Sequence, residues 1–306
     1  MVKDYRKPTS LAEALALLRE PGAVALAGGT FALIGEEHGD RPDIALAVDV
    51  AELLPRSIAR QGNGGDSRLV IGAGVSFQEL ADAQLVPACL RAAALTMANR
   101  NTRNRATVGG NLGANKSCAS LVPILLALDA VVEYAVAAAG AKAGAKPGPS
   151  GQELELDVKI GPLEQWLAEP RGILLSVAAD LGAGLFAASG RASRTACDLA
   201  TATVGVRYRL EGEGSQASPA GALPAGVPRV PRGLRVALGG FGPHARLYPE
   251  IAALFEGKPL PPKADIEAAV EPLLEARPDQ RGGAAYKKRR GAVILADALY
   301  AAEALA

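Results

Sequence analysis

Two short glycine motifs are the parts of this sequence best suited to hold a phosphate group. The first, Leu26-Ala27-Gly28-Gly29-Thr30, is an apolar run that ends in paired glycines and a hydroxyl residue. Paired glycines let a turn present its backbone N–H groups with no side chain in the way, and such a concave turn binds anions. Thr30 could add a hydroxyl donor. A tight turn between a strand and a helix, without any ligand, explains this motif equally well, because short glycine motifs recur by chance.

The second motif spans residues 103–111 (RNRATVGGN) and places another glycine pair, Gly109 and Gly110, beside Thr107 and Asn111. It lies within a polar stretch, residues 99–115, between two apolar segments. We expect this stretch to be an ordered loop, and long ordered loops tend to carry function. A plain glycine turn between helices is therefore a weaker explanation here than it is for the first motif.

Several common sites are excluded by what the sequence lacks. No G-x-G-x-x-G follows a predicted strand, and neither G-x-x-x-x-G-K-[ST] nor G-x-S-x-G occurs, which argues against a Rossmann site, a P-loop and an α/β-hydrolase. Two histidines, His38 and His244, are too few for a metal site built on several histidines. The three separated cysteines, Cys89, Cys118 and Cys197, are too few for a disulfide framework or a four-cysteine iron–sulfur cluster in this chain. We interpret Cys118 as a small packing residue rather than a redox group.

Charge and hydropathy narrow the class of protein further. The 33 basic and 32 acidic residues give a net charge of +1, so nothing draws the whole chain to nucleic acid. We interpret the basic run at residues 287–290 (KKRR) as the solvated face of a C-terminal helix. No apolar run approaches the roughly 20 residues that a membrane span needs, and the polar N-terminus does not resemble a signal peptide. We expect a cytoplasmic protein without a membrane span.

The elements that must position the two motifs are short helices and strands in mixed order. A helix over 11–18 and strands over 24–27 and 43–50 predict a small α/β unit that closes near residue 55. Ser76 with Glu79 has the spacing of a capping box at the start of a helix. Before the second motif we expect a strand at 68–71 and a helix within 85–97. After it we expect strands at 130–134 and 154–160, helices within 121–128 and 162–168, and a low-complexity loop at 137–151.

The pattern changes near residue 172. We expect strands at 173–177, 185–189, 201–210 and 234–239, a Gly/Ala/Pro-rich loop at 211–233, and a helical tail from about 251. Val204, Val206 and Tyr208 should share one face of their strand. The prediction is an α+β chain with a first domain over 1–172, in subdomains of about 1–55 and 56–172, followed by an antiparallel sheet-plus-helices domain over 173–306.

Taken together, these motifs make the chain resemble the FAD-binding medium subunit of molybdenum hydroxylases, the xanthine dehydrogenase and aerobic CO dehydrogenase family. The resemblance rests on Ala27-Gly28-Gly29-Thr30, on the 103–111 motif about eighty residues later, and on residues 71–75 with Glu79-Leu80 between them. It continues with Arg191-Ala192-Ser193-Arg194, Asp198-Leu199-Ala200, and Tyr286 followed by residues 287–295. The resemblance therefore covers nearly the whole chain.

This resemblance implies a two-part FAD-binding domain of the type shared with p-cresol methylhydroxylase (PCMH-type), followed by a CO dehydrogenase flavoprotein-like C-terminal domain. It implies FAD as the cofactor and assigns no catalytic or metal-ligating residue to this chain. The implied FAD contacts are Leu26, Ala27, Gly28, Gly29, Thr30, Phe31, Thr107, Gly109, Gly110, Asn111, Ala114 and Ser120. The two glycine turns would embrace the pyrophosphate.

The resemblance also implies partners and a role. A substrate would be oxidised at a molybdopterin-binding large subunit, and electrons would pass through the [2Fe–2S] clusters of a ferredoxin-like small subunit to FAD here, then to an acceptor such as NAD. An alternative is a structural subunit with a degenerate FAD pocket, because many family members have an acidic residue at the position of Ser120 and some have a lysine at that of Thr201. A stand-alone flavin oxidase of the same fold is a third interpretation.

Overall fold

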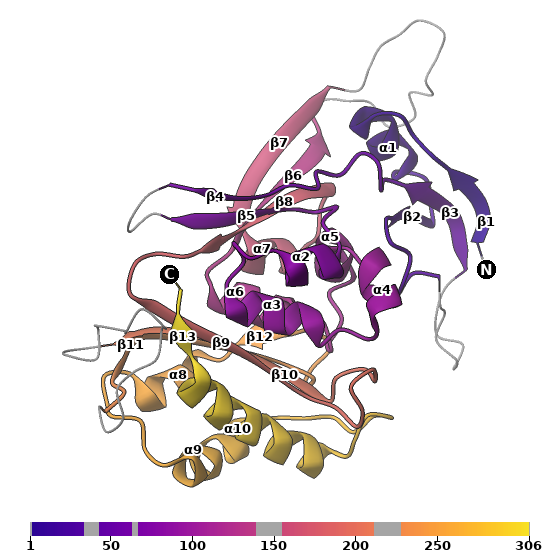
Figure 1. Ribbon diagram of the computed structural model, residues 1–306. Coiled ribbons are helices and arrows are strands. Elements are labelled where there is room, and N and C mark those ends of the chain that lie inside the picture. Colours follow the sequence, from indigo (N-terminus) through magenta and orange to yellow (C-terminus); the bar gives the residue numbers. More distant parts are fainter. Residues whose placement is uncertain (1, 34–42, 63–66, 139–154, 211–227, 306) are drawn as a thin grey trace, which may run out of the picture.

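The chain folds into two units that are stacked one above the other in Figure 1. The computed structural model describes residues 2–33, 43–62, 67–138, 155–210 and 228–305. The first unit contains two sheets and a layer of helices, and the second contains one sheet with its own helices. This arrangement is the mixture of helices and mainly antiparallel sheets that the sequence predicts.

A small three-stranded sheet begins the first unit. Its elements are β1 (Val2–Arg6), α1 (Leu11–Leu17), β2 (Ala23–Leu26) and β3 (Ile44–Asp49). Both β1 and β2 pair with β3 in parallel, in the order β1-β3-β2. Ser10 starts α1, since its Oγ accepts a hydrogen bond from the backbone N–H of Glu13 (3.2 Å). The predicted small α/β unit is confirmed, and β2 delivers the first glycine motif to one end of this sheet.

The outer layer of the first unit is a five-stranded antiparallel sheet in the order β4-β5-β8-β6-β7. Its strands are β4 (Ile58–Gln61), β5 (Arg68–Gly72), β6 (Val131–Ala137), β7 (Leu156–Pro162) and β8 (Ile173–Asp180). The helices of this unit are α2 (Phe77–Asp82), α3 (Ala88–Leu95), α4 (Arg100–Arg105), α5 (Val108–Ala114), α6 (Val122–Ala127) and α7 (Leu163–Ala168). The capping box of Ser76 and Glu79 at the start of α2 is confirmed.

The segment 99–115 is not the loop that the sequence suggests, because it forms the two short helices α4 and α5. Asn99 begins α4, its side chain accepting from the N–H of Thr102 (2.9 Å), and Thr107 begins α5 by accepting from Gly110 (3.0 Å). Such caps satisfy N–H groups that a helix start leaves unpaired. Val108 and Leu112 of α5 are fully buried, so tertiary packing offsets the low helix propensity of its glycines.

The sheet partners of β8 move the boundary between the two units. The sequence suggests a boundary near residue 172, which would assign β8 to the second unit. The structure instead pairs β8 with β5 and β6, with Val177 opposite both Ile71 and Val132. A strand pattern shows that a segment is extended but not which sheet it joins. We therefore place the boundary after β8, at residues 181–184.

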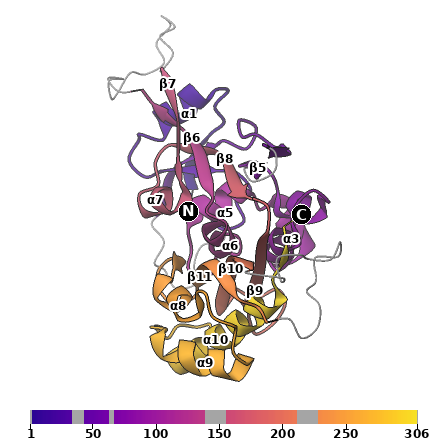
Figure 2. The same ribbon diagram turned by 90° about the vertical axis from the view of Figure 1, so that its left-hand side faces the viewer.

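The second unit is a five-stranded antiparallel sheet with helices on its outer face (Figures 1 and 2). Its strands, in the order β12-β11-β10-β9-β13, are β9 (Leu185–Ala192), β10 (Ala202–Leu210), β11 (Pro231–Gly239), β12 (Arg246–Leu247) and β13 (Glu303–Ala304). Its helices are α8 (Pro249–Phe255), α9 (Lys263–Val270), the 3-10 helix η3 (Glu271–Leu273) and α10 (Ala284–Ala301). Val204, Val206 and Tyr208 pack in the core of this unit, as predicted, and the Tyr208 hydroxyl donates to Leu299 O (2.7 Å).

The opposite face of this sheet is covered by helices of the first unit. Helices α3 and α6 lie between the two units, with α6 against β10 and β11. At Gly205 of β10 the chains come so close that an added Cβ would overlap the backbone of Ile124 and Pro123 at the start of α6. The lack of a side chain at Gly205 therefore allows the two units to pack this closely.

A buried arginine, Arg207, and a partly buried one, Arg235, add charge pairs at the same interface. Arg207 of β10 lies 3.1 Å from Asp180 at the end of β8. Arg235 of β11 lies 3.2 Å from Asp129 and donates to the carbonyl oxygen of Leu126 (3.1 Å). Both arginines belong to the second unit and their partners to the first, so the pairs fix the orientation of one unit on the other.

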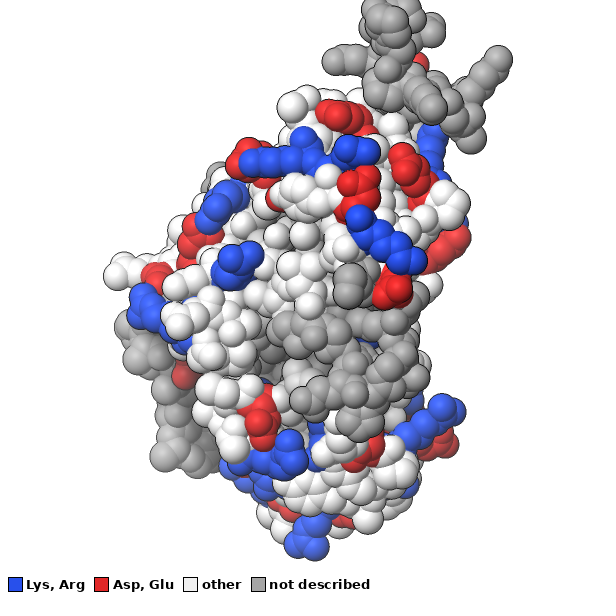
Figure 3. Space-filling view, turned by 90° about the vertical axis from the view of Figure 1, so that its right-hand side faces the viewer, with Lys and Arg blue, Asp and Glu red and all other residues white. Residues whose placement is uncertain are grey.

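The surface of the first unit carries both signs of charge. Figure 3 shows Lys and Arg interspersed with Asp and Glu on the face that carries β1, and exposed pairs such as Lys3–Asp43 (3.7 Å) and Lys7–Glu52 (2.6 Å) contribute to it. Exposed pairs of this kind add little stability. Within the described residues, no helix is both long and apolar enough to cross a membrane.

We expect Gly205→Ala to destabilise the protein by about 1–3 kcal/mol, because the new methyl group overpacks the contact with α6. Urea unfolding of both proteins measures the difference. Gly161→Ala on β7 is the matched control, since a Cβ there meets nothing within 4 Å. Equal stability of Gly205→Ala and the wild type would show that α6 can move away from the sheet without cost.

Candidate functional site

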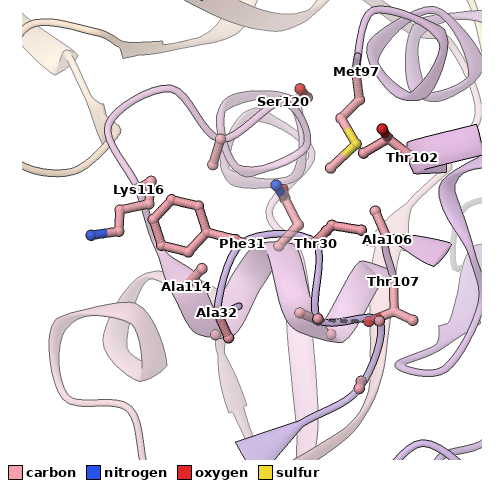
Figure 4. A pocket seen from close by; sticks show the side chains of 18 of the residues that line it. Thr30, Phe31, Ala32, Met97, Thr102, Ala106, Thr107, Ala114, Lys116 and Ser120 are labelled. Atoms are coloured by element: carbon pink, nitrogen blue, oxygen red, sulfur yellow. Dashed lines mark hydrogen bonds between the residues drawn. The ribbon is translucent and has the colours of Figure 1, made fainter. Parts of the chain in front are cut away.

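A cavity of about 780 Å³ lies where the small sheet, helices α4 and α5, and a loop of the second unit meet. Figure 4 shows part of its lining. All twelve residues predicted as FAD contacts line this one cavity: Leu26, Ala27, Gly28, Gly29, Thr30, Phe31, Thr107, Gly109, Gly110, Asn111, Ala114 and Ser120. The two glycine motifs, which lie far apart in the sequence, thus meet at one site.

The first glycine turn offers free hydrogen-bond donors to the cavity. It leaves β2 after Leu26, whose carbonyl oxygen accepts from the N–H of Val50 (2.8 Å). Gly29 has a φ of +68°, a left-handed conformation that favours glycine. Among the described residues, the backbone N–H groups of Gly28, Gly29 and Thr30 have no acceptor. Unpaired N–H groups around a cavity are what an anionic ligand requires.

The two turns touch each other through their backbones. A Cβ on Gly28 would overlap the carbonyl oxygen of Arg105 and approach the Cα of Ala106 to 3.2 Å. The Arg105 side chain also reaches back, its Nε donating to the carbonyl oxygen of Gly28 (3.4 Å). Only glycine permits this approach, so Gly28 fixes the spacing between the first turn and the junction of α4 with α5.

The second turn has its backbone donors already satisfied. The N–H groups of Val108 and Gly109 donate to the carbonyl oxygens of Val75 (2.9 Å) and Ala73 (2.8 Å). Gly110 donates to Thr107 Oγ1 (3.0 Å) and Asn111 to Thr107 O (3.0 Å). The sequence suggests free N–H groups in both turns, and the structure leaves them free only in the first.

Helix α5 instead gives the cavity a wall without bulky side chains. Gly110, Gly113 and Ala114 share a helix face, because residues three and four apart lie above one another. A Cβ on Gly113 would meet nothing within 4 Å, and one on Gly110 only the Thr107 hydroxyl at 2.9 Å. On the same helix, Asn111 Oδ1 accepts a hydrogen bond from the backbone N–H of Leu121 (3.3 Å), which ties α5 to the segment before α6. A flat ligand can therefore lie directly on this helix.

Several lining residues were not predicted from the sequence. Figure 4 shows Lys116 beside the Phe31 ring, its Nζ 4.8 Å from the ring centroid, and Met97 and Thr102 elsewhere in the lining. Gly113 was also missed, although a helical reading of residues 108–114 would have placed it on the face of Gly110. No feature of the sequence marks Met97 or Lys116 as a lining residue, since their positions depend on the path of the chain after α3 and α5.

The second unit supplies a further part of the lining through the loop after β9. Arg191, Cys197, Asp198, Leu199 and Ala200 all line the cavity. The Arg191 guanidinium donates to the carbonyl oxygens of residue 196 (3.1 Å) and of Asp198. Burial lowers the pKa of Arg191, and the carboxylate of Asp198 opposes this effect. The Arg191–Ala200 motif singled out in the sequence thus closes one side of the cavity.

A charge cluster built around the buried Lys287 holds the end of that loop in place. Lys287 of α10 is only 2% exposed, and its Nζ lies 2.7 Å from Asp279. Arg281 binds the same carboxylate and donates to the carbonyl oxygen of Ala200 (3.3 Å), while the Thr201 hydroxyl donates to Arg281 O (3.2 Å). The prediction that the whole 287–290 run is solvated is therefore wrong for Lys287, because the turn before α10 folds back over it.

His244 forms a hydrogen bond with the residue that ends α5. The Nδ1–H of His244 donates to the carbonyl oxygen of Asn115 (2.6 Å), which ends α5 in a left-handed conformation. His38 lies outside the described residues. Among the described residues, no group of three or more His, Cys, Asp or Glu side chains could hold a metal ion.

Comparison with known proteins finds similarity to the first part of the sequence and to the fold of the whole chain. Residues 1–143, which contain both glycine turns, match the family model described as the FAD binding domain in molybdopterin dehydrogenase. Over 137 residues the chain is 35% identical to the xanthine dehydrogenase FAD-binding subunit of Escherichia coli O157:H7, covering 42% of this chain and 45% of that protein.

Two further relatives match nearly the full length. The uncharacterized protein YgfM of Escherichia coli (strain K12) is 29% identical over 304 residues, which cover 98% of this chain and 96% of YgfM. The structure of carbon monoxide dehydrogenase from Hydrogenophaga pseudoflava contains a chain that superposes with a TM-score of 0.72 at 24% identity, covering 98% of this chain and 97% of that one. The shared fold therefore includes both units.

The charge cluster predicts a pH dependence of stability. Burial of the Asp279 carboxyl raises its pKa, but hydrogen bonds from Arg281 and Lys287 outweigh this and bring the pKa from 3.8 to about 2. The carboxylate's contribution is thus complete above about pH 4 and is lost as the pH falls toward about 2. With partial exposure of the carboxylate, we expect at most about 2 kcal/mol.

Urea unfolding of wild type and Asp279→Asn between about pH 7 and about pH 2.5 measures this contribution. The variant should be less stable at neutral pH, because the buried Lys287 loses its charged partner, and the two proteins should converge in acid. Asp297→Asn is the control, since Asp297 pairs with Lys263 on the surface and should change stability by under about 1 kcal/mol. If the difference in unfolding free energy between the wild type and Asp279→Asn stays constant with pH, the stabilisation does not come from the ionised Asp279 carboxylate.

Proposed function

Because residues 1–143 match the family model of the FAD binding domain in molybdopterin dehydrogenase, we propose that this chain is the FAD-binding electron-transfer subunit of a molybdenum-hydroxylase-type dehydrogenase. The observation that carries the proposal is the single cavity in which both glycine turns meet, with unpaired N–H groups on one side and the bare face of α5 on the other. Bound FAD would supply one- and two-electron transfer, and the chemistry would belong to the cofactor.

The residues of the cavity fit FAD in distinct ways. The N–H groups of Gly28, Gly29 and Thr30 would hold the diphosphate, whose negative charge needs several donors at once. Gly110 and Gly113 would let the cofactor rest on α5. In this proposal the second glycine motif contributes shape, while the first contributes the hydrogen bonds.

The remaining predicted contacts extend this lining. Leu26, Ala27, Phe31 and Ala114 are apolar and suit the ring systems, while Thr107, Asn111 and Ser120 bring polar groups. Lys116 places a cation near the Phe31 ring. Ser120 can donate to or accept from a cofactor hydroxyl without a charge, so the acidic residue of many family members is replaced by a neutral hydrogen-bonding group.

The partners in this proposal are a small subunit with [2Fe–2S] clusters and a large molybdopterin-binding subunit. The three cysteines of this chain cannot ligate a four-thiolate cluster, so electrons must arrive from a cluster held elsewhere. The relative from Escherichia coli O157:H7 is itself named as a subunit, which supports an assembly that works only as a complex. NAD is the proposed acceptor.

The first test is flavin binding by the purified chain after incubation with FAD and removal of free FAD. We expect retained absorbance near ~370 and ~450 nm. Gly113→Leu should weaken FAD binding at least about tenfold, or by about 1.4 kcal/mol, because its side chain fills the space above α5. The same substitution removes a helical glycine, so folding should not suffer.

Gly161→Leu is the matched control, because its side chain would also enter open space but on β7, away from the cavity. It should retain FAD like the wild type. A folded wild-type chain that holds no flavin would favour the alternative of a structural subunit with a degenerate pocket. If Gly113→Leu binds FAD as tightly as the wild type, α5 does not contact the cofactor.

The acceptor is tested separately by adding NADH to the flavin-loaded chain without oxygen. If NAD is the physiological acceptor, the reverse reaction should bleach the ~450 nm band, since hydride transfer between nicotinamide and flavin is reversible. An unchanged band in a chain that holds FAD would exclude NAD and leave the FAD proposal standing.

A further inference from the structure

Strand β7 forms one edge of the five-stranded sheet in the first unit. In the order β4-β5-β8-β6-β7 it lies at one end, and among the described strands it pairs only with β6. Figure 1 shows it at the margin of the unit. An edge strand presents a row of backbone N–H and C=O groups with which another strand can pair. With seven residues, β7 is long enough for such pairing.

The hydrogen bonds between β6 and β7 show which groups of β7 point away from β6. At the two ends of this pair, the N–H of Ala138 donates to Glu155 O (2.8 Å), and the N–H of Leu163 donates to Ala130 O (2.8 Å). Along an antiparallel pair, residues that exchange such bonds alternate with residues that do not. The odd-numbered residues of β7 therefore bond to β6, and the even-numbered ones from 156 to 160 turn their N–H and C=O groups outward.

The side chains of β7 divide between two faces, because successive residues of a strand point to opposite sides of the sheet. Val158 and Ile160 share one face and are 55% and 73% exposed. Asp157 and Lys159 share the other face and are also exposed, and neither forms an ion pair with another described residue. The edge therefore carries two exposed apolar side chains and one charge of each sign.

This arrangement is complementary to a second copy of the same strand. A lysine on an edge strand usually discourages pairing. If two copies of β7 run antiparallel with Val158 opposite Val158, however, each Lys159 lies opposite Asp157 of the other copy. The same alignment puts each Ile160 opposite Leu156. One register thus pairs unlike charges and apolar side chains, and it brings the outward N–H and C=O groups of the two strands together.

The charges also select this register over its neighbours. A shift by two residues would put either Lys159 opposite Lys159 or Asp157 opposite Asp157, and like charges directly opposite each other repel. A shift by one residue would turn outward groups toward groups that already bond to β6. In the favoured register the charged residues form non-hydrogen-bonded pairs, whose Cβ atoms lie about 4.5–5.5 Å apart, which is within reach of an ion pair.

We propose that two copies of this chain associate through β7, with the strands antiparallel and a twofold axis at Val158. The same patch then serves both copies, as a twofold interface requires, and the two five-stranded sheets become one continuous sheet. An interface of a few residues per chain is small, so the dimer forms reversibly and depends on protein concentration. No residue of β7 lines the cavity, so the association leaves that site open and does not depend on the proposed function.

Sedimentation equilibrium of the full chain at low salt tests the association, and we expect a monomer–dimer equilibrium. Val158→Pro should abolish the dimer but keep the fold, because it removes an outward N–H and no bond to β6. Val158→Thr is the matched control, since it keeps the N–H and the β-branched shape. A monomer at all concentrations up to about 0.5 mM would overturn the proposal and leave this edge to a different partner. So would a dimer that a folded Val158→Pro still forms.

Exchange of the two charges tests the register. Asp157→Lys alone and Lys159→Asp alone should each raise the Kd of the dimer at least about fivefold, because each puts like charges opposite each other in both symmetric pairs. The double variant Asp157→Lys with Lys159→Asp restores unlike pairs, so its Kd should return to within about twofold of the wild type. All of these side chains are exposed, so the fold should be unaffected. Single variants without effect, or a double variant without recovery, would overturn the proposal.

Discussion

The contact between the backbone of Gly28 and that of Arg105 and Ala106 is the constraint on which the site depends. It joins the end of β2 to the junction of α4 and α5, two places nearly eighty residues apart in the sequence. No side chain stands between them, so the distance between the turns is set by van der Waals contact of main-chain atoms. The cavity lies beside this contact, and residues of both turns line it.

The two turns are alike in sequence and different in their physical role. Ala73, Val75 and Thr107 accept from the donors of the second turn, and its glycines allow α5 to pack closely and to present a bare face. The first turn keeps its donors unpaired within the described part of the protein, so they are available to a ligand in the cavity. A paired arrangement of one rigid wall and one open set of N–H groups suits a cofactor that is flat at one part and anionic at another.

The second unit completes the site through the loop after β9. Its sheet is held against α6 by the close approach at Gly205, and the loop after β9 reaches the cavity from that platform. Arg191 holds the loop from within, and the cluster of Asp279, Arg281 and Lys287 holds its end at Ala200. The cavity thus depends on the packing of both units, which agrees with a fold that the carbon monoxide dehydrogenase chain shares over nearly its whole length.

The sequence by itself determined the two glycine motifs, most strands and helices, the capping box at Ser76, and the inward face of Val204, Val206 and Tyr208, because these features depend on local periodicity and turn chemistry. Only the tertiary structure decided that residues 99–115 form two helices, that β8 joins the first sheet, that Lys287 is buried, and that Gly113 and Lys116 line the cavity. Glycines oppose a helix locally, and a strand pattern does not name its partner. The helices in residues 99–115 and the sheet partners of β8 were decided by long-range burial and strand pairing, which the local sequence does not reveal.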